Sequence, residues 1–156
     1  MKKEVNYLNI LTNVLLGKKN RITNAIGYLD TGNTLKCSLT GRHVSIATYS
    51  VAAALATTEM LPVIDKYVND PSSICRYQNT FPKGLHLIPY NTICSKGQIM
   101  LAMDADYMFI DTRYIEKNPL IGISPNTFTI LRTDKCILLN KNNMKRGQRH
   151  VKHNKG

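Results

Sequence analysis

The sequence has no apolar run approaching the roughly 20 residues that a membrane-spanning helix needs. It also lacks the continuous apolar core of a signal peptide, because Asn6, Asn9 and Asn13 interrupt the apolar residues that follow Lys2 and Lys3. We therefore expect a soluble chain without an export signal. With 156 residues and 43% apolar content, it is long enough to bury a core of its own as one domain.

Cysteine is scarce and widely spaced. Cys37, Cys75, Cys94 and Cys136 include no Cys-x-x-Cys pair, and no pair of histidines has the spacing of zinc ligands. We expect reduced cytosolic thiols rather than disulfides or a metal site, and no cofactor is predicted. The sequence leaves open a catalytic cysteine paired with one of the four histidines, although no local signature supports it.

Acidic residues are few, ten against 21 Lys and Arg, which gives a formal net charge of +11. The excess gathers at the C-terminus, where residues 141–156 contain six Lys or Arg and no acid, so that residues 1–140 carry a net charge of +5. Because this tail also lacks aromatic residues, we expect it to be disordered and solvated. Contact with nucleic acid or anionic lipid is the alternative. The predicted organisation is a domain at 1–140 and a basic tail at 141–156.

The pattern of apolar and turn-forming residues predicts a β-rich fold with one or two short helices. The polar turn at residues 17–20 indicates a β-hairpin whose second strand covers residues 22–29. Further strands are expected at residues 43–48, 85–90, 93–94, 99–102, 107–110, 128–132 and 136–139. Helices are expected at 51–56, with Ser50 as the N-cap, and at 59–68, with Pro62 in the first turn, followed by a loop at 69–84.

The segment Asp30-Thr31-Gly32-Asn33 directly follows the second strand of the predicted hairpin. Its residue types suit carboxylate-dependent peptide hydrolysis: Thr31 offers a hydroxyl to a partner loop, and Gly32 lets backbone amides approach the carboxylate of Asp30. That reaction needs two carboxylates sharing one proton, one to activate water and the other to polarise the scissile carbonyl. The alternative is an ordinary turn, since Asp, Gly and Asn all favour turns.

A second element, Leu120-Ile121-Gly122, lies far downstream. In pepsin-like lobes an apolar-apolar-Gly element crosses behind the catalytic turn, so we interpret these three residues as its supporting loop. Taken alone, they would be core and turn. The sequence contains one Asp-Thr-Gly turn and has length for one lobe. We therefore expect the second carboxylate to come from a second copy in a symmetric homodimer.

In these segments the sequence resembles the protease domain of the sporulation sigma-E factor processing peptidases of spore-forming bacteria. The resemblance extends over roughly residues 5–140 and rests on Gly27-Tyr28-Leu29-Asp30-Thr31-Gly32-Asn33-Thr34-Leu35, Leu39-Thr40, Val44, Leu87-Ile88-Pro89-Tyr90, Leu120-Ile121-Gly122-Ile123 and Cys136-Ile137. It implies a single-lobe retropepsin-like fold completed as a homodimer. It also implies an aspartic endopeptidase that removes the pro-segment of an inactive sigma factor, with Asp30 as the catalytic residue and Thr31, Gly32 and Asn33 as its supporting turn.

The sequence departs from that family in three places. The family's membrane-embedded N-terminal half has no counterpart, so we expect an excised domain or a shortened relative, located in the cytoplasm or at the cytoplasmic face of the membrane. Cys37-Ser38 stands where the family often has Asp-Pro. His86 stands where an arginine is expected before Leu-Ile-Pro. These differences concern regulation and substrate contacts more than the chemistry.

Three other interpretations remain open from the sequence. A basic β-domain that binds nucleic acid is supported by the charge and by eight tyrosines, but no RNA-binding aromatic motif is present. Asp104, Asp106 and Asp111 could ligate a metal, but the glycine and terminal glutamate of a calcium loop are missing. A catalytically inactive peptidase kept as a scaffold is the third. In a peptidase, a hairpin at residues 94–99 is a candidate flap over the substrate.

Overall fold

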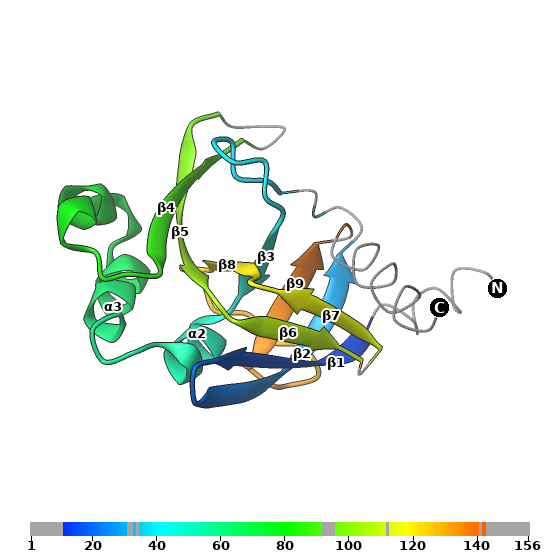
Figure 1. The fold of residues 1–156 in the computed structure, drawn as a ribbon. Coiled ribbons are helices and arrows are strands. Elements are labelled where there is room, and N and C mark those ends of the chain that lie inside the picture. The colour runs from blue at the N-terminus through cyan, green and yellow to red at the C-terminus, as the bar shows by residue number, and fades with distance from the viewer. Residues whose placement is uncertain are drawn as a thin grey trace.

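The computed structural model describes residues 11–30, 33, 35–91, 96–111, 113–140 and 142 (Figure 1). The secondary-structure elements follow in the order β1 (Leu11–Lys18), β2 (Arg21–Asp30), β3 (Val44–Ala47), α2 (Tyr49–Leu55), α3 (Leu61–Asn69), the 3₁₀ helix η1 (Pro71–Thr80), β4 (Leu85–Tyr90), β5 (Gln98–Asp104), β6 (Tyr107–Ile110), β7 (Tyr114–Lys117), β8 (Leu120–Ile123) and β9 (Cys136–Asn140). The prediction of a mainly β fold with short helices is confirmed.

The described strands form one sheet in the order β4-β5-β8-β3-β9-β2-β1-β6-β7. Most neighbours are antiparallel, but β2 pairs with β9 and β3 pairs with β8 in parallel. The two parallel pairs join segments that are far apart in the chain. They therefore place the end of β2 beside the end of β9, with the start of β3 on the other side of β9.

The β1–β2 hairpin confirms the first sequence prediction. Its strands pair along their full length and are joined by Lys19 and Asn20. Lys19 has a φ of 55°, the left-handed conformation that two-residue hairpin turns require. Buried and accessible residues alternate through most of β2, so one face of this strand packs on the core. The second strand of the hairpin ends at Asp30, within the interior of the sheet.

The helices lie together beside the sheet, and α2 packs against β1, β2 and β9 (Figure 1). Pro62 occupies the first turn of α3, as predicted. The predicted N-cap of α2 was wrong, because the helix begins at Tyr49 with Thr48 at the cap position. The Ser50 hydroxyl instead donates a hydrogen bond to Asp134 at 2.9 Å. The expected loop at 69–84 also contains the 3₁₀ helix η1.

The predicted strands at 43–48, 85–90, 99–102, 107–110 and 136–139 are confirmed as β3, β4, β5, β6 and β9. The strand predicted at 128–132 was wrong, because Leu131 and Arg132 both have positive φ and form a turn bridged by Ile130 and Thr133. The strand β7 was not predicted. The segment 93–94 lies outside the described residues, as do residues 94 and 95 of the candidate flap and all of the basic tail except Asn142.

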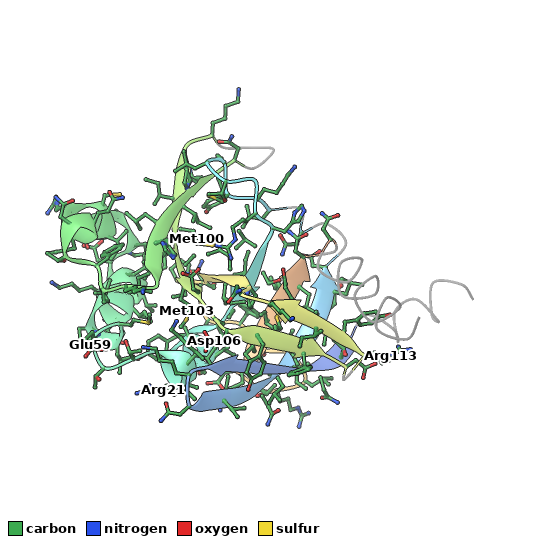
Figure 2. All side chains as sticks on the ribbon, viewed as in Figure 1. Arg21, Glu59, Met100, Met103, Asp106 and Arg113 are labelled. Atoms are coloured by element: carbon green, nitrogen blue, oxygen red, sulfur yellow. The ribbon has the colours of Figure 1, made fainter. Side chains whose placement is uncertain are left out.

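Two apolar clusters lie on opposite faces of β5. Leu101 and Met103 belong to the main cluster between the helices and the sheet, whereas Met100 and Ala102 belong to a smaller cluster with Val44 and others. Figure 2 labels Met100 and Met103 along this strand. Alternation along a strand explains how successive residues reach different cores. No helix in the described part of the chain is long and apolar enough to cross a membrane.

Candidate functional site

Asp30 is the last residue of β2, an interior strand of the sheet, and is half-buried. In the parallel β2–β9 pair its register partner is Asn140, the last residue of β9. The backbone N–H of Asn33 donates to the Asp30 carbonyl at 2.8 Å, which closes a four-residue turn after the strand. Thr31 and Gly32 lie outside the described residues.

The buried side chain of Asn33 makes hydrogen bonds within its own turn and to two strands. Its Oδ1 accepts from the backbone N–H of Leu35 at 3.1 Å, while its Nδ2 donates to the carbonyls of Val44 and Leu138, each at 3.4 Å. Buried backbone carbonyls are costly to leave without a partner. The side chain of Asn33 thus connects the turn that follows Asp30 to both β3 and β9.

Two further buried polar residues adjoin this turn, and the sequence reasoning missed both. Asn140 and Ser45 are each fully buried, and the Asn140 backbone N–H donates to Ser45 Oγ at 3.1 Å. Asn140 Nδ2 donates to the Leu35 carbonyl at 2.9 Å. The only signal in the sequence is an Asn that directly follows the apolar run 136–139, since a buried carboxamide needs hydrogen-bond partners.

The predicted supporting loop Leu120-Ile121-Gly122 forms the strand β8, which lies between β5 and β3. It is therefore separated from β2 by β3 and β9, and the strand directly beside the Asp30 end of β2 is β9. The glycine permits close packing: a Cβ atom at Gly122 would lie 2.4 Å from Met100 Sδ and 3.0 Å from Val44 Cγ1. Leu120 thus belongs to the smaller apolar cluster and Ile121 to the main one, and β9 is the strand next to the turn.

The three carboxylates considered as metal ligands lie apart or have other partners. Asp106 accepts the backbone N–H of Lys19 at 2.6 Å. Asp111 follows β6, next to the Arg113 end of the β6–β7 hairpin, whereas Asp106 precedes β6 (Figure 2). Among the described residues, no group of three His, Cys, Asp or Glu is placed to hold a metal ion.

Asp104 belongs to an ion-pair group at the base of the β4–β5 hairpin. Its carboxylate lies 2.7 Å from His86 Nε2 and 3.6 Å from an Arg42 guanidinium nitrogen, and Arg42 also donates to the Asn118 carbonyl at 2.6 Å. A pocket of about 490 Å³ opens here, lined by Arg42, His43, Asp104, Ala105, Asp106, Glu116, Lys117, Asn118 and Leu120. Asp30 is not part of this lining, so the pocket is separate from the predicted catalytic carboxylate.

Cys37, Cys75 and Cys136 are free thiols, and Cys94 lies outside the described residues. Burial opposes ionisation of Cys37, but hydrogen bonds at Thr40 and the charge of Arg42 outweigh it and lower the pKa of this thiol. Burial raises the pKa of Cys136, which donates to the Thr133 carbonyl at 2.9 Å. The partners of these two buried thiols include hydroxyl, backbone and guanidinium groups.

Comparison with known proteins places this arrangement in a family. A search of curated proteins and a search of solved structures each found no match. The profile of the family Peptidase U4, described as sporulation factor SpoIIGA, matches residues 1–141, which include β2, β9 and the turn after Asp30. The match extends over most of the chain and agrees with the resemblance drawn from the sequence. The chain therefore belongs to the SpoIIGA family of sporulation peptidases.

Proposed function

We propose that this chain is an aspartic endopeptidase that activates a pro-sigma factor during sporulation, with one Asp30 carboxylate supplied by each subunit of a homodimer. The observation that carries the proposal is the position of Asp30. Asp30 ends the interior strand β2, and the turn after it is held by two buried carboxamides, Asn33 within the turn and Asn140 from β9. An ordinary surface turn does not require such a buried polar network.

The chemistry follows from the pairing of two identical carboxylates. A two-fold axis brings identical patches together, so it can set Asp30 against its own mate. Two carboxylates at hydrogen-bonding distance share one proton, because like charges that close cannot both ionise. The ionised member then takes a proton from water, and the protonated member donates to the scissile carbonyl. Asp30 is the only Asp in the sequence followed by Thr-Gly or Ser-Gly, so one chain supplies half of the pair.

The test is incubation of the chain with a pro-sigma factor, comparing wild type with Asp30→Ala and Asp30→Asn. Cleavage should be lost in both variants while the fold stays largely intact by circular dichroism, and chelators should have no effect on the wild type. Full cleavage by Asp30→Ala contradicts the assignment. Loss of wild-type activity with EDTA would point to a metal mechanism. If the wild-type chain cleaves nothing although the Asp30→Asn variant keeps its fold, the result favours an inactive scaffold.

The dimer has its own test. An equal mixture of wild-type and Asp30→Ala chains that re-pair freely leaves about a quarter of the dimers with both carboxylates, by the statistics of a two-fold assembly. Activity should therefore fall well below half, and it should decline more steeply than linearly on dilution near the dimer dissociation constant. A one-for-one loss in the mixture, or constant specific activity under conditions shown by light scattering to be monomeric, contradicts a shared site.

A further inference from the structure

The ladder between β3 and β9 ends before the strands do. Its register pairs are Ala47 with Ile137 and Ile46 with Leu138. Beyond them the two strands are joined by side chains instead of by the backbone ladder, because Ser45 Oγ accepts the backbone N–H of Asn140. At the start of β3, the backbone N–H of Val44 donates instead to the Leu35 carbonyl at 3.0 Å.

Asn140 provides hydrogen bonds to buried backbone groups beyond the end of the β3–β9 ladder. Its Nδ2 donates to the Leu35 carbonyl at 2.9 Å and lies 3.4 Å from the Val44 carbonyl, and its Oδ1 accepts the backbone N–H of Asn142 at 3.0 Å. Asn33 Nδ2 donates to the same Val44 carbonyl. Two carboxamides, one within the turn and one from β9, thus hold both ends of the segment that follows Asp30.

We infer that Asn140 is a positioning residue for Asp30. The inference rests on the proposed function and deepens it. Asn140 is the register partner of Asp30 in the β2–β9 pair, and its side chain holds the exit of the turn at Leu35. A catalytic pair of carboxylates tolerates little displacement, since a misplacement of about 1 Å can reduce the rate by about 10²-fold. The effect of Asn140 operates through the backbone on either side of Asp30, at the β2–β9 pair and at Leu35.

A purely structural role predicts a different result from a positioning role, and the chain offers a matched control. Thr48 is also buried and also joins β3 to β9, but at the opposite end of these strands, where its hydroxyl accepts the Cys136 backbone N–H at 3.2 Å. Thr48→Ala and Asn140→Ala each remove a buried side chain that bridges the two strands. Both should lower the unfolding midpoint, but only Asn140→Ala should alter the chemical step.

The experiment measures kcat and KM of the 156-residue chain on a pro-sigma factor that the wild type cleaves, at a temperature where all variants are folded. Asn140→Ala should lower kcat by about ten- to a hundredfold with KM changed less than about threefold. Thr48→Ala should keep kcat within about threefold of wild type. An unchanged kcat in Asn140→Ala, or equal losses in the two variants, overturns the positioning role.

If Asn140→Ala does not fold, Asn140→Asp is the alternative test variant, because it keeps the size of the side chain. The introduced carboxyl can donate to the Leu35 carbonyl only when protonated. Its kcat relative to wild type should therefore rise as the pH falls through the pKa of that carboxyl, which burial places above the usual value of about 4. A ratio that stays flat with pH overturns the inference. Wild-type cleavage that survives Asp30→Ala refutes the proposed function itself, whereas normal kcat in the Asn140 variants beside an inactive Asp30→Ala refutes the inference alone.

Discussion

Gly27 lies in β2, three residues before Asp30, at a point where the sheet has no room for a side chain. A Cβ atom there would lie 2.6 Å from Val14 Cγ2 and 3.0 Å from Leu139 Cδ1. Val14 and Leu139 are both buried, on the strands to either side of β2, so neither can move aside freely. Overpacking of this kind costs about 1–3 kcal/mol. The smaller entropy of an unfolded chain with alanine offsets roughly 0.4–1 kcal/mol of this cost.

We therefore expect Gly27→Ala to lower the free energy of unfolding by about 1–2 kcal/mol. For a chain of this length, that loss corresponds to roughly 2–8 °C in Tm. The matched control is Gly122→Ala, where the closest atom is Met100 Sδ at 2.4 Å. Met100 has a flexible side chain that can turn away, and Val44 Cγ1 at 3.0 Å needs only a small adjustment, so this variant should lose less stability than Gly27→Ala.

Urea denaturation followed by circular dichroism measures both variants, and equal m values would show that the stability itself has changed. A loss below about 0.5 kcal/mol for Gly27→Ala would refute the packing argument, because that is within the usual range of neutral surface substitutions. A greater loss for Gly122→Ala than for Gly27→Ala would refute it too. In that case Met100 would be the immobile neighbour, and β2 the strand that adjusts.

Three further predictions concern other parts of the chain. Burial raises the pKa of the Tyr67 hydroxyl. The contribution of this hydroxyl to stability is therefore fully present below its unfolded pKa of about 10 and is lost as the pH rises through its folded pKa. Between pH 9 and 11 the free energy of unfolding should fall less steeply in Tyr67→Phe than in wild type. His86→Ala should change that free energy by less than about 1 kcal/mol, because His86 and Asp104 are 44% and 37% exposed and solvent screens their pairing; a loss of several kcal/mol in urea denaturation would contradict this. Deletion of residues 141–156 should leave cleavage of a short peptide nearly unchanged, whereas any effect with anionic vesicles should fade with added salt; unfolding on truncation would show that the tail is structural.

Local signals in the sequence predicted the elements whose shape is decided locally. The β1–β2 hairpin followed from its turn residues and β9 from a short apolar run, and α3 was expected with Pro62 in its first turn. Ser50 failed as a cap because the contacts that decide it lie far along the chain: Ser50 bonds to Asp134, and Thr48 bonds to the Asp134 carbonyl. The strand expected at 128–132 failed because the backbone turns at Leu131 and Arg132, whose composition gives no turn signal.

The residues of the candidate site also differ in whether a local sequence signal marks them. Asp30 and Asn33 were predicted because their residue types stand together in the sequence, and the structure describes the contacts of Asn33. Asn140 and Ser45 were not, because nothing local distinguishes an Asn after a strand from one in an ordinary turn. The apolar-apolar-Gly pattern drew attention to β8, but the strand beside Asp30 was decided by parallel pairing between β2 and β9, which no local pattern reveals.

The pairing of β2 with β9 also has a consequence for how the protein acquires its site during synthesis. The hydrogen bond from Asn140 to Leu35 closes a separation of 105 residues, whereas the β1–β2 hairpin needs only neighbouring residues. Contacts of such long range form late and slowly, since the loop-closure entropy is lost before they contribute. A ribosome adding about 5–20 residues per second exposes β2 several seconds before β9. A nascent chain thus carries Asp30 at the end of a formed hairpin without β9, and an early-terminated product would lack the hydrogen bonds that join Asn140 and Leu138 to the segment after Asp30.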